Sequence, residues 1–372
     1  MKFTVIRSRF LELMANVQSL VPVKPSLQIL MNAMFDATED NTLTLTATDL
    51  DMTVRASMST DVKVDEPGRT TLPVRRIIEI LRMAPEGEVT FEIDHDNIAR
   101  VVTCAAKYRV IGLDVREYPA IAEPEEETRA FTMDRAVFRE MLRKISYAAS
   151  TDETRRMLTG VLMKFADSKL TMVATDSKRL ALVEQEIEFP EENACEMILP
   201  PKAVSELSRL LSGEGPMTIY AQGNKLMIAC DSLRFYSKLI EGTYAKYQTV
   251  IPTMCEERVS VGREELISSI QRVSIMSNNK ILAVRLNWTE GALNLMSSNV
   301  ETGEANDVIP IKYSGEEFCA TYNPTYILEC LKNLDSDEVI FELSKGHAPT
   351  VIKCEGLPFL YVIMPLRLPS QA

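Results

Sequence analysis

The sequence predicts an α+β protein built from three tandem copies of one domain, each with two helices packed on antiparallel sheets. Three landmarks, each recurring at close to a third of the 372 residues, support this fold class. The first is an apolar strand closed by a polar turn, at 43–49, 170–176 and 293–299, with turn residues 127 and 123 positions apart. The second is a proline opening an amphipathic helix, at Pro73, Pro200 and Pro324. The third is an apolar residue of the opening strand, at Phe3, Phe131 and Val259.

The period of about 125 residues exceeds the roughly 20–50 of a solenoid, so the repeating unit is a whole domain. We predict domains at 1–122, 129–254 and 256–372, with acidic or polar connectors between them. Apolar residues at helical spacing predict helices at 8–21, 73–84, 134–149, 201–212, 263–277 and 324–334. Proline suits the first helical turn because its missing N–H has no partner there. Alternation predicts strands at 89–93, 217–220 and 339–343.

Composition is that of a globular protein, with 46 % hydrophobic and 25 % charged residues. No apolar run approaches the ~18 residues of a membrane span. Residues 1–6 alternate like a strand and lack the features of a signal peptide, so we expect a cytoplasmic protein. The seven cysteines are scattered without a C-x-x-C pair, which favours buried reduced thiols over a disulfide frame or a zinc site.

The net charge of −12 argues against a nucleic-acid partner only if it is spread evenly. The predicted helices hold 13 Lys and Arg against 8 Asp and Glu, a net +5, which leaves −17 for the rest of the chain. Arg135, Arg139 and Arg143 follow an i, i+4, i+8 spacing and share one helix face. Such stripes are also common on helices that merely face water. The division of charge favours a helical surface that faces a phosphate backbone.

Binding to double-stranded DNA would then be electrostatic, sequence-independent and salt-sensitive. The sequence has no groove-reading motif and few aromatic residues on these faces. The basic residues that we expect to face DNA are Lys24, Arg75, Arg76, Arg82, Arg135, Arg139, Arg143, Lys202, Arg209 and Lys280.

We find no pattern that indicates catalysis, a cofactor or a metal. The two histidines, His95 and His347, have no nearby partners, and no phosphate-binding glycine loop is present. Asp49 and Asp51 could hold a metal, but the turn differs among the copies. A turn aspartate that bonds its own backbone is the favoured interpretation. A rival hypothesis of an enzyme working at the turns of Asp49 or Asp176 lacks a substrate site.

The C-terminal segment 357–367 is strongly apolar. Residues 360–363 suit a final core strand, whereas Met364, Pro365 and Leu366 lie beyond its expected end. Exposed apolar groups around a proline suit a pocket for a partner peptide, and methionine allows several ligands to repack.

These segments also carry a family resemblance. The chain resembles the bacterial DNA polymerase III β subunits, or β sliding clamps, over its full length. The matching segments are Met1–Val5, Thr48–Leu50, Ala174–Asp176 with Arg179 and Leu180, Ser237–Leu239 and Tyr361–Arg367. The resemblance implies three tandem DNA-clamp domains, with two chains forming a six-domain ring around duplex DNA. It implies a non-catalytic processivity factor for DNA replication that tethers the polymerase III α subunit, the clamp loader and other proteins with clamp-binding motifs. The alternative is an acidic three-domain scaffold that binds proteins without encircling DNA.

The resemblance also implies two protein interfaces. A peptide pocket between the second and third domains would involve Leu158, Thr175, Lys178, Arg179, Leu180, Val250, Tyr326, Val362, Met364, Pro365, Leu366 and Arg367. The homodimer interface would set Tyr108, Arg109 and Val110 against Ile275, Met276, Glu301 and Glu304.

Three departures from the family's pattern affect the peptide pocket. Lys178 stands where the family often has histidine, Ala245 stands where proline is common, and the chain continues past Arg367. We expect these departures to alter pocket shape and peptide preference without abolishing binding.

Overall fold

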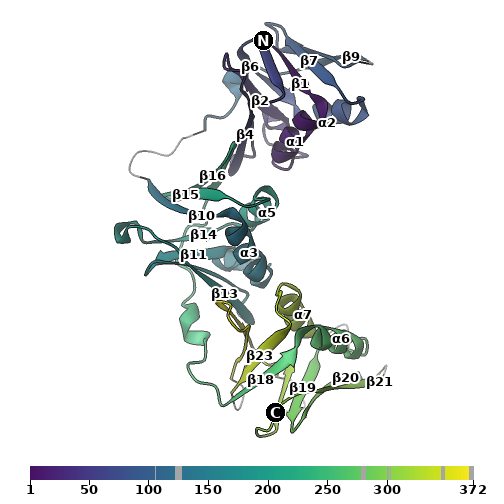
Figure 1. The fold of residues 1–372 in the computed structure, drawn as a ribbon, viewed down its shortest axis with the longest axis vertical. Helices are drawn as coiled ribbons and strands as arrows, with labels where there is room; N and C mark the ends of the chain where they lie inside the picture. The colour runs from purple at the N-terminus through teal and green to yellow at the C-terminus, as the bar shows by residue number, and fades with distance from the viewer. Residues whose placement is uncertain are drawn as a thin grey trace. The chain divides into compact units, whose positions relative to one another are not determined.

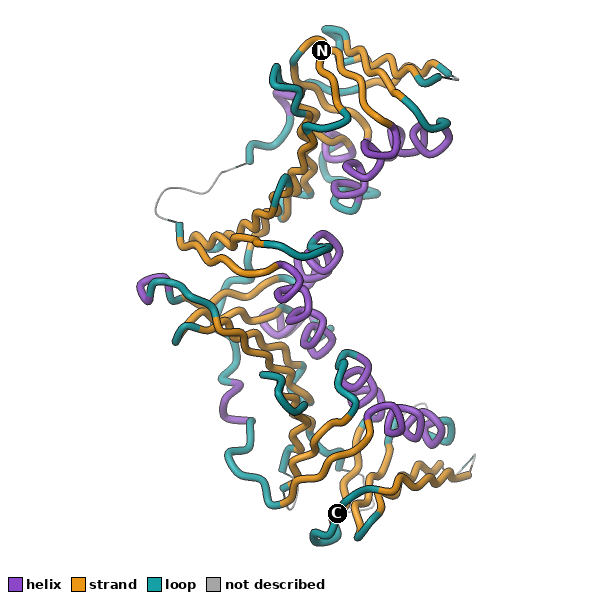
Figure 2. The backbone as a smooth tube through the Cα atoms, viewed as in Figure 1, coloured by secondary structure: helices purple, strands orange, loops and turns teal. Residues whose placement is uncertain are grey.

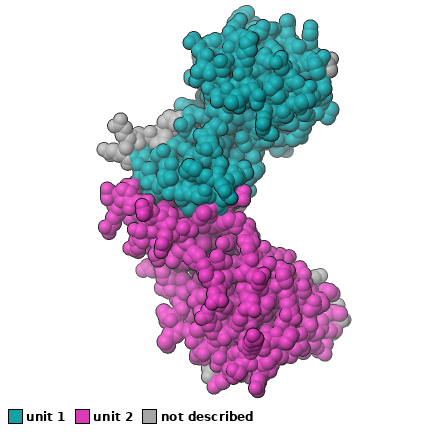
Figure 3. Space-filling model, viewed as in Figure 1, with its two compact units in different colours: residues 1–136, 205–239 teal, residues 137–204, 240–372 magenta. Residues whose placement is uncertain are grey.

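The computed structural model describes residues 1–104, 106–121, 128–277, 282–299, 301, 303–344 and 348–367. The chain forms two compact units (Figure 3). Unit 1 comprises residues 1–136 and 205–239, and unit 2 comprises residues 137–204 and 240–372. The strand pairings in both units are antiparallel, as the alternating apolar patterns predict.

Unit 1 contains a five-stranded and an eight-stranded sheet. The order in the first is β5 (Val62–Glu66), β1 (Lys2–Ile6), β7 (Glu88–Ile93), β8 (Ile98–Val102), β9 (Lys107–Ile111). The order in the second is β10 (Arg129–Asp134), β15 (Pro216–Gln222), β16 (Lys225–Cys230), β17 (Leu233–Lys238), β4 (Met52–Met58), β3 (Leu43–Thr48), β2 (Asn32–Ala37), β6 (Gly68–Pro73).

Unit 2 contains an eight-stranded and a four-stranded sheet. The order in the first is β14 (Cys195–Leu199), β11 (Val161–Ala166), β12 (Lys169–Thr175), β13 (Arg179–Glu186), β25 (Phe359–Ile363), β24 (Thr350–Lys353), β23 (Glu338–Leu343), β18 (Glu257–Gly262). The order in the second is β21 (Gly303–Pro310), β20 (Ala292–Asn299), β19 (Val284–Thr289), β22 (Phe318–Tyr322).

The six predicted helices are present in the described chain, and each is shorter than predicted. They are α1 (Arg7–Gln18), α2 (Val74–Met83), α3 (Arg135–Ile145), α5 (Pro201–Leu210), α6 (Arg263–Ser274) and α7 (Pro324–Lys332). The region after α3 tightens into a 3₁₀ turn at Ser146–Ala148, so the helix stops before the predicted residue 149. A short helix, α4 (Arg156–Thr159), was not predicted because four residues are too few to show a helical period. In unit 1 α1 and α2 contact each other and the sheets, and in unit 2 α6 and α7 do so (Figures 1 and 2).

The threefold repeat is confirmed in the order of the elements. Apart from β5, the short α4 and the 3₁₀ turns, each repeat runs strand, helix, four strands, helix, three strands. The landmark residues Phe3, Phe131 and Val259 are all buried in their opening strands. By this order β4, β13 and β21 are equivalent strands, and so are β9, β17 and β25.

Each eight-stranded sheet joins strands of two consecutive repeats. In unit 1, β4 of the first repeat pairs with β17 of the second. In unit 2, β13 of the second repeat pairs with β25 of the third. The strands of the middle repeat are therefore divided between the two units, and the chain does not separate into three compact bodies.

The core lies between the sheets and the apolar helix faces. In unit 1 it centres on aromatic rings, with Phe3 stacked on Phe91 at 4.8 Å and Phe10 edge-on to Phe91 at 5.4 Å. Within the described chain, no helix is long and apolar enough to cross a membrane.

The prediction of buried cysteines is correct for only part of the set. Cys230, Cys330 and Cys354 are buried and Cys195 is half-buried. The prediction is wrong for the remaining three, because Cys104, Cys255 and Cys319 are exposed. Cys104 and Cys255 lie outside regular elements, and Cys319 lies on the edge strand β22.

Candidate functional site

The turn between β12 and β13 is built by side chains that bond their own backbone. The Asp176 Oδ1 accepts hydrogen bonds from the Lys178 N–H at 2.9 Å and the Arg179 N–H at 3.0 Å. The Thr175 hydroxyl donates to the Arg179 carbonyl at 2.6 Å. Ser177 has a φ of +74°, which the short polar side chains around it make tolerable. The interpretation of Asp176 as a structural turn residue is confirmed.

This turn ends beside an apolar cluster in unit 2. Leu180 and Val362 lie opposite each other in the pairing of β13 with β25, and each is 2 % exposed. The buried cluster around them comprises Leu162, Val173, Leu180, Ile198, Ile240, Tyr244, Tyr247 and Val362. The predicted pocket residue Leu158 packs against the cluster from outside. Val250 and Met364 are exposed by 45 % and 41 %. A buried apolar floor with exposed apolar groups nearby suits the side chains of a peptide.

Arg179 is buried inside the protein rather than exposed at the predicted pocket. Its guanidinium donates to Asp176 Oδ2 at 3.2 Å, to the Tyr147 carbonyl at 2.6 Å and to Glu329. It also stacks over the ring of Tyr326, 4.4 Å from the centroid. Burial lowers the pKa of Arg179, but interactions with Tyr361 and Glu329 raise that pKa by more than burial lowers it. The pKa of Arg179 therefore lies above its usual value. Arg179 is thus a fixed cation that joins the turn to α7 and positions Tyr326.

The chain beyond β25 is fixed by two backbone hydrogen bonds. The Met364 N–H donates to the Lys178 carbonyl at 3.0 Å, and the Leu366 N–H donates to the Thr321 carbonyl at 2.7 Å. Pro365 and Leu366 are half-buried, while Lys178 and Arg367 are exposed. The pocket residues predicted from β13 and the C-terminal segment are therefore brought together.

Sequence reasoning missed part of this cluster. Ile240 and Tyr244 lie in irregular backbone and Tyr247 begins a 3₁₀ turn, so these apolar residues follow neither a helical nor a strand period. Periodicity could not have identified them. Ala245 lies between the two buried tyrosines, so the departure from the family's proline falls at the edge of the cluster.

The helices are basic, as predicted. With the observed bounds, the six helices contain 14 Lys and Arg against 7 Asp and Glu, a net +7. On α2, Arg75, Arg76 and Arg82 are exposed, and Lys24 beyond α1 is exposed too. Arg76 pairs with Glu79 at 2.8 Å, whereas within the described chain Arg82 and Lys24 have no ion-pair partner.

The arginine stripe of α3 differs from the expectation of three charges that face solvent. The Arg135 side chain is only 19 % exposed, because it is drawn to Asp231 at 2.6 Å and to the Glu214 carbonyl at 2.9 Å. Arg143 is half-buried and pairs with Glu140 at 2.7 Å and with Asp335. Arg139 is also half-buried. The shared face is real, but Arg135 and Arg143 on it are already engaged by the protein.

The last predicted DNA-facing residues have different surroundings. Lys202 is exposed, and Lys280 lies outside the described residues. Arg209 is exposed, yet it donates to the Ala15 and Asn16 carbonyls, both at 3.1 Å, and to Ser19 Oγ at 2.6 Å. Arg209 therefore caps the C-terminal end of α1.

The residues predicted for a homodimer interface lie at two sheet edges. On the edge strand β9, Tyr108 is half-buried and Arg109 is exposed, while Val110 is 5 % exposed and faces the interior of its own unit. Its neighbour Ile111 is 64 % exposed and was missed by the sequence reasoning. Successive side chains of a strand point to opposite faces, so Ile111 is exposed where Val110 is buried.

The complementary edge lies in unit 2. Glu304 on the edge strand β21 is exposed, as is Glu301 before it, and Ile275 after α6 is 78 % exposed. Met276 is half-buried. Val308 on β21 adds a further exposed apolar side chain, at 56 %.

The turn aspartates do not form a carboxylate pair suited to catalysis. Asp49 Oδ1 accepts from the backbone N–H groups of Asp51 and Met52, and Asp51 pairs with Lys238 at 3.0 Å. His95 is exposed by 91 % and contacts Asp96 at 3.6 Å, while His347 lies outside the described residues. Among the described residues, no group of three His, Cys, Asp or Glu side chains is placed to hold a metal ion.

The chain matches known families along nearly its whole length. Models of the N-terminal, central and C-terminal domains of the DNA polymerase III beta subunit match residues 1–122, 132–246 and 248–367. The beta sliding clamp of Proteus mirabilis is 32 % identical over 99 % of this chain and 100 % of its own length. That of Chlamydia pneumoniae is 30 % identical over 99 % of both chains.

Solved structures give the same result. A sliding clamp from Bartonella birtlesii, bound to griselimycin, has a TM-score of 0.92 and 32 % identity, covering 99 % of this chain and 100 % of its own. A DNA polymerase sliding clamp from Bacillus subtilis has a TM-score of 0.94 and 26 % identity, covering 99 % of both chains. These similarities do not favour a scaffold that binds only proteins.

Proposed function

The chain belongs to the family of DNA polymerase III β subunits, the β sliding clamps, and we propose that two copies close head to tail into a ring around duplex DNA. The ring holds the replicative polymerase and other DNA-processing proteins on the template and catalyses no reaction itself. Its three clamp domains span 1–122, 129–254 and 256–372, and it acts in the cytoplasm. The single observation that carries ring closure is the pattern of strand pairing between repeats.

Both junctions between consecutive repeats of one chain are formed by pairing of equivalent strands. Two strands of the same kinds remain, one at each end of the row of repeats, and could form a third junction with another copy. β4 pairs with β17, and β13 pairs with β25. Their remaining equivalents, β21 and β9, are edge strands. An unpaired edge is a template for another chain, so β21 of one copy pairs with β9 of the next and creates two identical joints in a closed dimer.

The chemistry of these edges supports the pairing. Exposed Ile111 and Val308 offer apolar surface on β9 and β21, and exposed Ile275 directly follows α6, which packs against β21. Arg109 on β9 is opposite in charge to Glu301 and Glu304. Burial of the apolar groups supplies stability, while the charges select register and partner.

The helices supply the surface that faces DNA. Their net charge of +7 contrasts with the chain's −12, so the phosphates are attracted to the helices and repelled elsewhere. Exposed Lys24, Arg75 and Arg82 provide contacts without base recognition. A ring holds the duplex topologically, so weak contacts suffice and permit sliding.

The apolar cluster of unit 2 receives short peptide motifs. Leu180, Val362 and Leu158 form its floor, and exposed Met364 adapts to different ligands. The polymerase α subunit, the clamp loader and other proteins with clamp-binding motifs compete for this surface.

The topological mechanism is tested by loading the protein onto nicked circular DNA with a clamp loader and then cutting the circle. We expect the protein to remain on the circle and to leave the linear form by sliding off its ends. Blocking both ends with bound protein serves as the control and restores retention. Equal retention on circular and unblocked linear DNA would contradict the proposal.

A further inference from the structure

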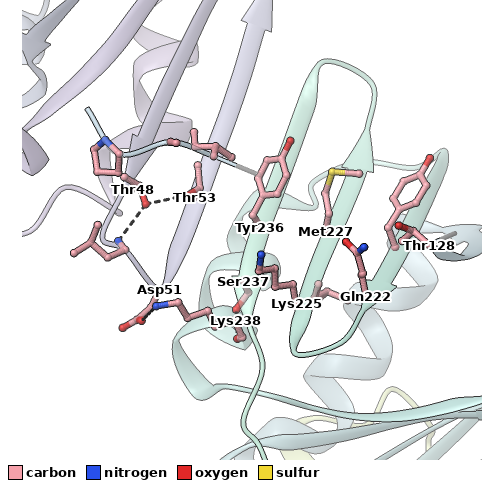
Figure 4. Close-up of a pocket in the computed structure, with 16 residues that line it drawn as sticks. Thr48, Asp51, Thr53, Thr128, Gln222, Lys225, Met227, Tyr236, Ser237 and Lys238 are labelled. Carbon is pink, nitrogen blue, oxygen red and sulfur yellow. Dashed lines mark hydrogen bonds and ion pairs between the residues drawn. The ribbon is translucent and has the colours of Figure 1, made fainter. Parts of the chain in front are cut away.

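Unit 1 contains a cavity of about 210 Å³ where β4 meets β17 (Figure 4). One wall is the turn after β3, including Thr48 and Asp51. The floor is formed by side chains of β15, β16 and β17, among them Met227 and Tyr236 (Figure 4). Nothing in the proposed ring closure or DNA contact uses this cavity.

The wall of the cavity repeats the hydrogen bonds that close the turn of the peptide pocket. Asp49 Oδ1 accepts from the backbone of Asp51 at 3.0 Å and Met52 at 2.8 Å, as Asp176 does from its own turn. The Thr48 hydroxyl donates to the Met52 carbonyl at 2.8 Å, as Thr175 does to Arg179. Leu50 has a φ of +78°, close to that of Ser177.

The strand junction is repeated as well. Thr53 lies opposite Tyr236 in the pairing of β4 with β17, as Leu180 lies opposite Val362 in that of β13 with β25. The Lys238 N–H donates to the Asp51 carbonyl at 2.9 Å, which matches the bond from Met364 to Lys178. The cavity is therefore the counterpart, one repeat earlier, of the peptide pocket.

The lining chemistry of the cavity differs from that of its counterpart. Tyr220, Met227 and Tyr236 lie directly opposite one another across β15, β16 and β17 and form a row of aromatic and sulfur-containing side chains. The pocket in unit 2 has aliphatic Val362 where this row has Tyr236.

Two lysines stand at the rim. Lys238 is neutralised by Asp51 at 3.0 Å (Figure 4). Lys225 lies opposite Lys238 in the strand pairing, is exposed, and within the described chain has no ion-pair partner. The charge of Lys225, which is uncompensated within the described chain, favours an anionic group at this rim.

We propose that this cavity is a second peptide site, which binds an acidic segment of a partner protein through one aromatic or aliphatic side chain and one carboxylate. The large side chain enters over Met227 and Tyr236, and the carboxylate pairs with Lys225. The assignment of a peptide as ligand rests on the proposed function of the equivalent pocket in unit 2. The two sites select different peptides because their floors and rims differ.

A labelled acidic peptide tests this site in the full-length protein. The probe is fluorescein-labelled Glu-Glu-Ala-Tyr-Leu-Glu-Glu, followed by fluorescence anisotropy, and we expect saturable binding. Lys225→Glu weakens it about tenfold, because attraction at the rim becomes repulsion. Lys63→Glu, an equal charge change at a lysine already paired with Asp65, leaves binding unchanged.

Two further measurements separate this proposal from the function of the ring. Met364→Asp alters the pocket of unit 2 and leaves binding of the acidic probe unchanged; if it abolishes binding while Lys225→Glu does not, the probe occupies the other pocket and this proposal fails. No binding, or equal binding of Lys-Lys-Ala-Tyr-Leu-Lys-Lys, also overturns it. Retention on circular DNA is scored separately, so failure of the ring mechanism leaves the result at Lys225 interpretable.

Discussion

At the scale of single residues, the molecule uses several arginines to hold its own structure. Arg179 binds a turn, a backbone carbonyl and Glu329, and Arg135 binds Asp231 and a neighbouring loop. Removing one partner of a buried pair leaves the other groups without compensation, which costs more than the pair itself contributes. Arg179, whose side chain is buried, therefore affects folding before it affects any ligand.

Arg179→Ala is expected to lower the free energy of unfolding by about 3 kcal/mol, because Asp176 and the Tyr147 carbonyl lose a buried cation. Urea unfolding measures the effect. Arg76→Ala is the matched control, since its pair with Glu79 is exposed and is worth at most about 1 kcal/mol. Equal losses for the two variants would show that Arg179 has no structural role.

At the scale of elements, the edge strands and the C-terminal segment bear the two proposed protein interfaces. β9 and β21 are edge strands of their sheets in the described chain and carry exposed apolar side chains. The C-terminal segment leaves β25 along the turn at Lys178 and is held at Thr321. These elements can be changed separately because they lie in different parts of the fold.

Ile111→Asp is expected to weaken self-association about tenfold or more, because a charge replaces an apolar contact at the joint between copies. Sedimentation velocity over a range of concentrations measures the change. Val23→Asp, at a similarly exposed apolar residue outside the strands, is the control and leaves association unchanged. An unaltered dimer in the Ile111 variant would rule out pairing through β9.

Removing residues 364–367 is expected to abolish binding of polymerase peptides, because exposed Met364 and half-buried Leu366 contribute the adaptable side of the pocket. The dimer remains intact, since no residue of this segment belongs to β9 or β21. Calorimetric titration and sedimentation measure the two properties on one sample. Peptide affinity equal to that of the intact chain would refute the pocket assignment.

At the scale of the whole molecule, charge is divided between the helices and the remainder. The division reconciles an acidic protein with a DNA partner, because only the basic helices need to approach the phosphates. Electrostatic contacts govern how the ring meets DNA, whereas topology governs how long a closed ring stays.

Lys24→Glu combined with Arg82→Glu is expected to slow loading onto DNA. For binding of the ring before it closes, the slope of log affinity against log salt concentration falls by about 2, near 0.9 for each lost phosphate contact. Retention on closed circles stays unchanged, because the closed ring does not depend on these contacts. Loading rate and lifetime on nicked circles, measured between low and moderate salt, test both statements. A shortened lifetime with normal loading would contradict a topological hold.

The sequence by itself determined the repeat, the elements and the turns. Proline positions, apolar periods and the aspartate turns are local patterns, so the six helices, the landmark strands and the role of Asp176 could be predicted from them. The β13 and C-terminal halves of the peptide pocket followed from their match to a known family.

Only the tertiary structure decided which strands pair between repeats and which charges remain available. The pairing of β4 with β17, far apart along the chain, is set by backbone hydrogen bonds that no local period encodes. The same holds for Arg135 and Arg179, which have partners in distant segments, and for Tyr244 and Tyr247, which lie outside α-helices and strands. Burial and partnership are properties of packing in three dimensions, so they appear only once the chain is folded.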